Sequence, residues 1–192
     1  LASNVERAKN DPNFLPTVLT KDFNVRETSA GAWLTFEEAN NEATFSMDEI
    51  RDTYAIGGVD LSATTDLTAA AILVMRPDGQ LYALVQGFMP GDTIEQRAKE
   101  DKVPYDRWVE RGLITPCPGN RIDHRYVTDW FARLRDEYGI STYWVGYDSW
   151  NSPAWVEDME TRLGYERKVN LLPVIMGAKT LSAPMKLLKA DL

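Results

Sequence analysis

Two aspartates stand where hydrophobic strands are expected to end. Asp60 follows the apolar run 54–59, and Asp148 follows the run 143–147. Aspartate is rare in strands, and a carboxylate in such a place costs folding free energy unless it is paired or binds a metal. Two placements of this kind in one small domain indicate a divalent-cation site.

A third carboxylate, Asp66, follows Asp60 across a small polar turn that contains Ser62, Thr64 and Thr65. Mg²⁺ and Mn²⁺ prefer oxygen ligands, and Mg²⁺ is often held by one or two carboxylates plus phosphate oxygens. In a site with two ions, one activates water and the other stabilises the leaving oxygen. We expect Asp60 and Asp148 to bridge such a pair and Asp66 to reach back as an accessory ligand.

Each carboxylate also has a purely structural interpretation. Asp60 could cap a turn, and Asp66 and Asp148 each suit a turn in which the aspartate side chain bonds to nearby backbone. The metal role is favoured for Asp60 and Asp148, whereas the two interpretations are evenly balanced for Asp66. The sequence alone leaves these alternatives open.

Other reactive or nucleic-acid-binding side chains are given structural roles. Cys117 and His124 lie in a loop rich in proline and glycine, which does not favour a catalytic pair. Lys179 and Lys186 are expected on the surface, with Lys179 in a loop that could contact a phosphate. Four tryptophans are expected in the core rather than as base-stacking platforms: Trp130, Trp144, Trp150 and Trp155.

Composition bounds the class of protein. The 192 residues are 44% hydrophobic, enough for one domain and an appendage, and we find neither a membrane-spanning run nor a secretory signal. A single cysteine excludes a disulfide within the chain and fits a reducing compartment. The net charge of -8 argues against a general basic groove for nucleic acid, but a carboxylate cluster awaiting metal would itself add negative charge. Because the chain starts at Leu1, we expect a fragment.

The regular pattern of expected strands and helices starts at Tyr54. Residues 1–50 are polar and are interpreted as a linker or docking segment. A helix is expected within it over 33–43, capped by Thr35. Residues 51–192 are expected to form the main domain. Strands are expected at 54–61, 67–76, 80–88, 142–148 and 171–176, with a short extended piece at 113–115. Helices are expected over 92–111 with a break at Pro104, from a cap at Asp123 to Gly139, over 153–163, and from a cap at Ser182.

This order predicts an α/β fold. Strands joined by short turns pair antiparallel, and strands joined by helices pair parallel. We therefore expect a mixed sheet, three antiparallel strands followed by parallel strands, with helices on both faces. Strand 54–61 should pair antiparallel with 67–76 and parallel with 142–148. Asp60 and Asp148 would then meet at one edge, with their carboxylates within about 6 Å of each other, close enough for ions ~3.5–4 Å apart.

Six segments, taken in order, resemble one known family. They are 57–69 (GGVDLSATTDLTA), 104–108 (PYDRW), 112–116 (GLITP), 119–123 (GNRID), 145–151 (VGYDSWN) and 176–186 (MGAKTLSAPMK). Upstream, 22–24 (DFN) and 32–34 (AWL) resemble the segment that joins this family's ATPase motor to its nuclease. The family is the nuclease domain of the large terminase subunit of tailed bacteriophages, and the resemblance covers roughly residues 1–190.

The resemblance implies a ribonuclease H-like fold and a metal-dependent endonuclease that cuts concatemeric viral DNA at packaging. It implies Asp60 and Asp148 as metal ligands, Asp66 as an accessory acid, and Mg²⁺ or Mn²⁺, in two ions, as cofactor. The implied partners are double-stranded DNA, the terminase ATPase domain, the small terminase subunit and the portal protein, in the bacterial host cytoplasm and not at a membrane. The chain lacks a Walker A pattern, and the family's third main acid is expected beyond residue 192, since Asp191 does not suit that role.

Two other functions remain open. An ATP-binding module of the actin and sugar-kinase type also begins with a strand, an acid and a threonine-rich turn, but it needs a second glycine-rich loop and a second domain. A non-catalytic module that grips DNA or docks partners would keep the aspartates as remnants. Nucleotide binding tests the first alternative, and metal-dependent nicking tests the second.

Overall fold

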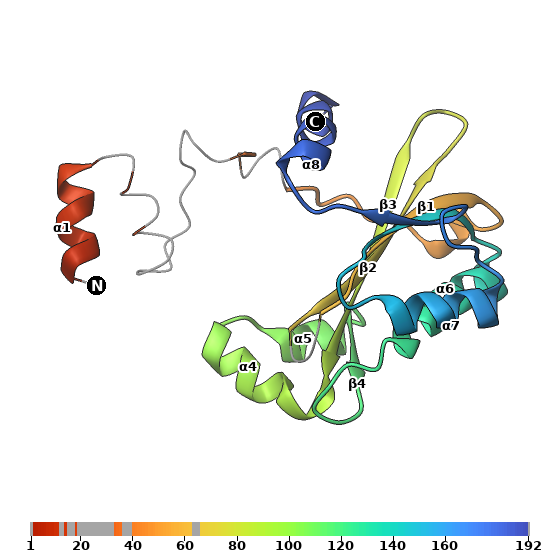
Figure 1. Cartoon of the computed structure of the whole chain (residues 1–192), viewed down its shortest axis with the longest axis horizontal. Helices are drawn as coiled ribbons and strands as arrows, with labels where there is room; N and C mark the ends of the chain where they lie inside the picture. The colour runs from red at the N-terminus through yellow and green to blue at the C-terminus, as the bar shows by residue number, and fades with distance from the viewer. Residues whose placement is uncertain are drawn as a thin grey trace. The chain divides into compact units, whose positions relative to one another are not determined.

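The computed structural model describes residues 2–11, 14, 18, 33–35, 40–62 and 66–191. The chain divides into two compact units, one of Leu1–Thr44 with Ala183–Leu192 and a second of Phe45–Ser182. Helix α1 (Ala2–Asn10) lies in the first unit. The second unit holds the sheet (Figure 1). Both strand-end aspartates belong to it. No helix in the described ranges is long and apolar enough to span a membrane.

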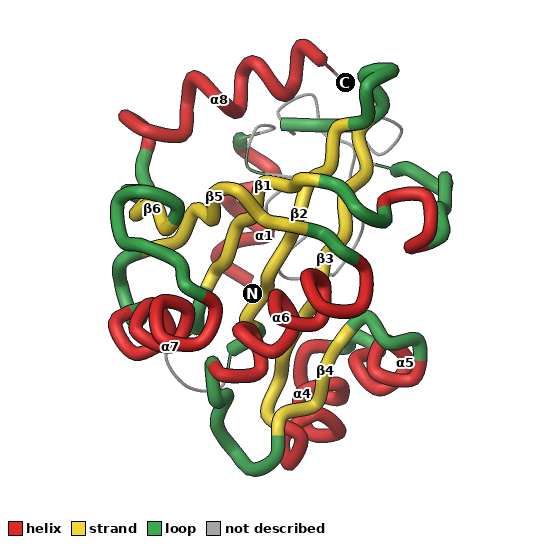
Figure 2. The backbone as a smooth tube through the Cα atoms, turned by 90° about the vertical axis from the view of Figure 1, so that its right-hand side faces the viewer, coloured by secondary structure: helices red, strands yellow, loops and turns green. Residues whose placement is uncertain are grey.

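Six strands form one mixed sheet in the order β4-β3-β2-β1-β5-β6 (Figure 2). Strand β1 pairs antiparallel with β2 and parallel with β5, and β2 pairs antiparallel with β3. Strand β4 joins the edge parallel to β3, and β6 lies parallel to β5 at the other edge. The predicted central position of the first strand is confirmed. The bounds are β1 Tyr54–Asp60, β2 Thr68–Met75, β3 Leu81–Pro90, β4 Ile114–Cys117, β5 Ser141–Asp148 and β6 Leu171–Val174.

Helices cover both faces, as predicted, but they cover them unequally. On one face, α6 (Arg125–Tyr138) and α7 (Pro153–Leu163) bury the main core, in which Phe131 and Trp155 pack with Val59. On the other face, α4 (Ile94–Asp101) and α5 (Tyr105–Glu110) form a small second core with the β3–β4 edge. Figure 1 shows these two helix pairs on opposite sides of the sheet. Among the described residues of the second unit, no helix packs on the second face over β1, β2 and β5, and Ile56 and Trp144 are exposed there.

Short signals in the sequence set most of the boundaries. Gly79, with φ 86°, closes the turn between β2 and β3, and the apolar face predicted for α6 is the face that is buried. Pro153 is the first residue of α7. The helix cap predicted at Asp123 is displaced by one residue: His124 is the N-cap, and the Asp123 carboxylate accepts a hydrogen bond from the Arg125 backbone at 3.0 Å.

Two helix predictions are wrong in the described residues. The last helix, α8, spans Ala178–Asp191 and contains Pro184 in its interior, rather than starting near it. Its first turn forms because the N–H groups of Thr180 and Leu181 both donate to the Gly177 carbonyl. The described parts of the predicted helix 33–43, residues 33–35 and 40–43, are not helical, and residues 36–39 lie outside the description.

Helix α6 ends against the turn that precedes β1, and this contact supports a test of the fold. Gly139 ends the helix at φ 66°, and a Cβ added there would stand 2.0 Å from Asp52 Oδ1 and 3.2 Å from Asp52 Cα. The Asp52 N–H also donates to the Tyr138 carbonyl at 2.9 Å. Gly164 ends α7 in the same backbone region, at φ 73°, but with nothing within 4 Å of an added Cβ.

Gly139→Ala is therefore expected to destabilise the chain more than Gly164→Ala. Left-handed backbone strain alone costs about 1–2 kcal/mol, which applies to both variants. The clash with Asp52 adds roughly 1–3 kcal/mol to the first variant only. Urea unfolding of both variants measures the difference, and equal losses of stability would contradict the packing described at Asp52.

Candidate active site

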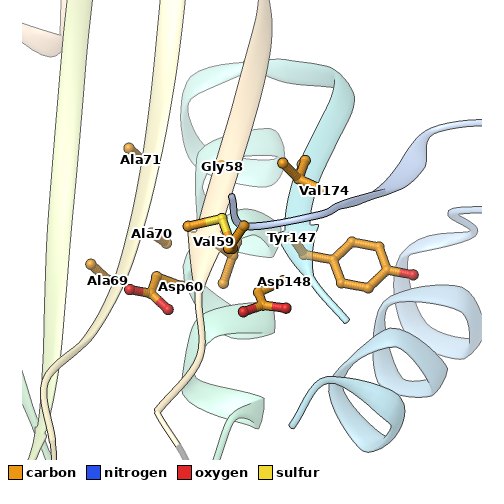
Figure 3. A pocket seen from close by; sticks show the side chains of 11 residues that line it. Gly58, Val59, Asp60, Ala69, Ala70, Ala71, Tyr147, Asp148 and Val174 are labelled. Atoms are coloured by element: carbon orange, nitrogen blue, oxygen red, sulfur yellow. The ribbon is translucent and has the colours of Figure 1, made fainter. Parts of the chain in front are cut away.

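Asp60 and Asp148 come together at one edge of the sheet. Strands β1 and β5 are parallel neighbours, and their last paired residues are Val59 and Tyr147. The two aspartates are the next residues on each strand, and adjacent strands lie about 4.7–4.9 Å apart. Figure 3 shows both carboxylates on the same side of the sheet, close to each other. The predicted meeting of the two acids is therefore present in the strand register.

The two carboxylates point to the open face because side chains alternate along a strand. Val59 and Tyr147 point into the main core and are almost completely buried. Asp60, by contrast, is exposed, and Asp148 is half-buried. Burial of the preceding residue on each strand thus fixes the direction of each carboxylate, at a place where water and ions can reach it.

A groove of about 350 Å³ lies beside the two carboxylates. Its floor consists of residues with little or no side chain: Gly58, Ala69, Ala71 and Gly146. A Cβ added at Gly58 would meet nothing within 4 Å, so the space above the strand is empty of protein. Val174, the last residue of β6, lies beside the groove (Figure 3), and Met176 also lines it. The groove leaves room for a substrate group directly next to the acids.

Asp148 also begins a turn, as the structural interpretation proposed. Its Oδ1 accepts a hydrogen bond from the Trp150 N–H at 3.0 Å, and Asn151 follows with φ 64°. This bond occupies one lone pair of a carboxylate that has about four acceptor sites. In the described part of the chain, no cationic side chain forms an ion pair with Asp60 or Asp148. The turn therefore orients Asp148 without neutralising it.

Asp66 does not line this groove. Its side chain is largely exposed, and Oδ1 lies 3.6 Å from the Arg97 guanidinium on α4. Arg97 Nε lies 3.2 Å from the Asp101 carboxylate as well. Residues 63–65, including Thr64 and Thr65, lie outside the description, while the Ser62 N–H donates to Thr68 Oγ1 at 3.0 Å. The accessory role of Asp66 stays a prediction.

The carboxylates of Asp60 and Asp148 fit part of a metal site. Two oxygen ligands on neighbouring strand ends match the way Mg²⁺ is held when phosphate and water complete its shell. Within the described ranges, no group of three or more histidine, cysteine, aspartate or glutamate side chains could hold a metal ion. Asp60 and Asp148 can thus supply two ligands, and the expectation of a third acid further along the sequence stays a prediction.

Cys117 and His124 do not form a nucleophilic pair. Burial, and secondarily the charge of Asp123, raise the pKa of the Cys117 thiol to about 11. His124 Nε2 lies 3.0 Å from the Ser62 carbonyl oxygen, so this ring links the N-terminus of α6 to the segment that follows β1. Cys117 ends strand β4 and is buried there, so its predicted loop position is wrong, while a structural role fits both residues.

The tryptophan prediction is correct for only half of its residues. Trp130 and Trp155 are buried in the main core, with 5% and 1% of their surface exposed. Trp144 and Trp150 are 50% and 77% exposed, so their assignment to the core is wrong. Trp144 lies on the open face of β5, and Trp150 lies in the turn after Asp148. Lys179 and Lys186 are exposed as predicted, although Lys179 lies in α8 rather than in a loop.

Comparisons with known proteins agree with this fold. A family model described as "Terminase large subunit, endonuclease domain" matches residues 1–190. The terminase large subunit of Enterobacteria phage HK97 is 28% identical over 160 residues, which is 83% of this chain and 31% of that protein. Protein YmfN of Escherichia coli K12 is 24% identical over 200 residues, which is 99% of this chain and 42% of that protein.

One solved structure shares the fold. The crystal structure of the HK97 bacteriophage large terminase is similar with a TM-score of 0.65 and 24% identity, and the match covers 98% of this chain and 38% of that chain. The present chain therefore spans less than half the length of the terminase and of YmfN. The sheet and its helices have the ribonuclease H-like pattern of a terminase nuclease.

Cys117 supports a prediction about reactivity in the folded chain. Because the thiolate is the reactive form, a pKa raised from 9.0 to about 11 lowers its population at pH 8 by about a hundredfold. Alkylation by iodoacetamide should be slow in buffer, faster as pH rises toward 11, and rapid in urea. Rapid alkylation at pH 8 without denaturant would show that Cys117 is accessible and ionised.

Proposed function

From the premise that the chain belongs to the family of terminase large subunit endonuclease domains, we propose that it is a metal-dependent endonuclease that cuts concatemeric double-stranded viral DNA during packaging. The observation that supports this proposal best is the placement of Asp60 and Asp148. They end neighbouring parallel strands, on one face, beside an open groove. The ends of parallel strands are where α/β sheets commonly bind ligands.

Asp60 and Asp148 would hold Mg²⁺ or Mn²⁺, and Asp66 would act as an accessory ligand to a second ion. Bound in this way, the ions would supply an activated water and charge stabilisation for the leaving oxygen of a phosphodiester. The chain's own residues supply the rest of the arrangement. The Trp150 N–H holds one oxygen of Asp148, and the small residues of the groove floor leave the approach to both carboxylates free.

Asp66 forms an exposed ion pair with Arg97. The guanidinium lies between Asp66 and Asp101, at 3.6 Å and 3.2 Å, and it extends from α4, which packs at the β3–β4 edge. An exposed pair of this kind contributes little to stability. It can therefore be exchanged when a cation or a phosphate competes for either partner, which suits an accessory rather than a principal ligand.

The other functions considered are weaker. A match to the nuclease family over 190 residues favours a nuclease over an actin-like or sugar-kinase-like ATP-binding module. A non-catalytic module that grips DNA or docks partners is the outcome that remains if cleavage fails. The proposed partners are double-stranded DNA, a terminase ATPase domain, the small terminase subunit and the portal protein, in the cytoplasm of a bacterial host.

The first prediction from this proposal concerns the acids. Asp60→Asn and Asp148→Asn should each abolish plasmid nicking with Mn²⁺ and weaken Mn²⁺ binding, because each removes one charged ligand. Asp66→Asn should slow nicking less. Electron paramagnetic resonance measures free Mn²⁺ independently of cleavage, and circular dichroism checks folding.

Asp78→Asn is a matched control for these variants. Asp78 lies in the turn between β2 and β3, where its Oδ1 accepts a hydrogen bond from the Gln80 N–H at 3.0 Å, which an asparagine oxygen can also accept. This variant should nick and bind Mn²⁺ like the unaltered chain. Full nicking by Asp60→Asn would refute the site. Mn²⁺ binding without nicking in the unaltered chain would favour the non-catalytic module.

The second prediction concerns DNA affinity. The chain has a net charge of -8, so its attraction to duplex DNA should rest on a few phosphate contacts and fall steeply as salt increases. A full-length terminase subunit containing this sequence should bind more tightly. Fluorescence anisotropy with labelled duplex at two salt concentrations compares the two proteins, and equal affinities would show that this chain is self-sufficient in binding DNA.

A further inference from the structure

Trp150 is the most exposed large aromatic residue in the described part of the chain, and it lies next to the candidate site. Its side chain is 77% exposed, although tryptophan is usually buried for most of its surface. It follows Asp148 by two residues, at the end of β5. Exposure alone is common for surface apolar residues; what sets Trp150 apart is that it stands two residues after Asp148, at the candidate site.

The backbone around Trp150 is held on both sides. Its N–H donates to Asp148 Oδ1 at 3.0 Å, and Asn151 follows in the left-handed region. Ser152 is buried, Pro153 begins α7, and Trp155 lies deep in the main core. The segment is thus anchored before and after the indole, while the indole itself faces solvent. The backbone on both sides is thus held in place, and the indole extends from it into solvent two residues after Asp148.

We propose that Trp150 stacks on a nucleobase next to the phosphate that is cut, and that the chain therefore prefers DNA in which a base at the cutting position is unpaired. This proposal rests on the proposed nuclease function. Aromatic side chains stack on every base because each has a π-face, so the contact would favour no sequence. In an intact duplex, neighbouring bases already cover both faces of each base, so stacking on Trp150 requires one to leave the helix.

Stacking also suits the charge of this surface better than phosphate binding does. Asp60 and Asp148 repel a phosphate until cations are present, and the gain from stacking an uncharged base on the indole offsets part of that repulsion. A base held by Trp150 would bring its own phosphate toward the two carboxylates. Stacking on the indole would therefore let an acidic site bind DNA without a basic groove.

Trp144 provides a matched control. It is also exposed, at 50%, and also lies on β5. It precedes Asp148 by four residues, which places it about 13 Å away along the strand. Trp144→Leu removes an exposed indole of the same kind at a distance from the carboxylates. Trp150→Phe keeps an aromatic face at the site, and Trp150→Leu removes it while keeping an apolar side chain.

The experiment titrates each protein with short labelled oligonucleotides in EDTA and low salt: a single strand, a perfect duplex and a duplex with a central mismatch bubble. Anisotropy gives the affinity and intrinsic tryptophan fluorescence reports stacking. The unaltered chain should bind the single strand and the bubble more tightly than the perfect duplex, with quenched emission. Trp150→Leu should lose on the order of tenfold in affinity for these two probes and most of the quenching. Trp150→Phe should keep most of the affinity, and Trp144→Leu should match the unaltered chain.

Equal binding by Trp150→Leu and the unaltered chain would overturn the proposal, and so would an equal loss in Trp144→Leu. The same titration in Asp60→Asn separates this proposal from the nuclease itself. If the Trp150 effect persists there and no protein nicks DNA, stacking stands and the nuclease proposal fails. If nicking depends on Asp60 but Trp150→Leu binds and nicks normally, the stacking proposal alone fails.

Discussion

The register between β1 and β5 is the constraint on which the candidate site depends. The two strands begin with Tyr54 beside Ser141 and continue with Ala55 beside Thr142, and then Ile56 stands beside Trp144. One residue of β5, Tyr143, is therefore skipped. Without that irregularity Asp60 would stand level with Tyr147, and the two acids would lie on opposite faces of the sheet, since side chains alternate. With it, Asp60 and Asp148 are level and share a face.

The skipped residue is accommodated at the opposite end of the strands from the acids. Tyr143 is exposed and packs edge to face with Tyr54, at 5.8 Å between ring centroids, and with Trp144, at 5.6 Å. Extra residues in strands are known to re-aim side chains near active sites. The core then fixes the result, because Val59 and Tyr147 can both be buried against α6 and α7 only in this register. Burial of apolar neighbours thus compensates the cost of placing two carboxylates side by side.

Much of the fold could be predicted from the sequence because its signals are local. The order of strands and helices, the turn around Gly79, and the helix stops at Gly139 and Gly164 each depend on neighbouring residues. The placement of Asp60 and Asp148 on one edge followed from strand order. The skip at Tyr143 could not be predicted, because it depends on pairing with a strand distant in the sequence.

The exposed tryptophans and α8 show a second limit of prediction from sequence: average residue preferences do not hold at every position. A preference for burial describes an average residue, and it failed for Trp144 and Trp150 because, in the described part of the second unit, no helix packs on the sheet face or the turn that carries them. Proline usually marks a helix start or stop, yet Pro184 lies inside α8, where Gly177 supplies the first carbonyl of the helix. The role of Asp66 depends on a cation, and neither propensity nor spacing determines it.

The openness of the site has a consequence for how cleavage would be controlled. In the described part of the chain, the groove lies on an open face beside carboxylates that form no ion pair, so the barrier to DNA there is electrostatic. The net charge of -8 adds to this repulsion. Cations lower that barrier only locally, at the two acids. If the proposed function holds, DNA reaches Asp60 and Asp148 when another domain or subunit holds the duplex in place and when a base is free to leave the duplex. An enzyme limited in this way cuts where DNA is presented and distorted, and it spares DNA that is merely passing.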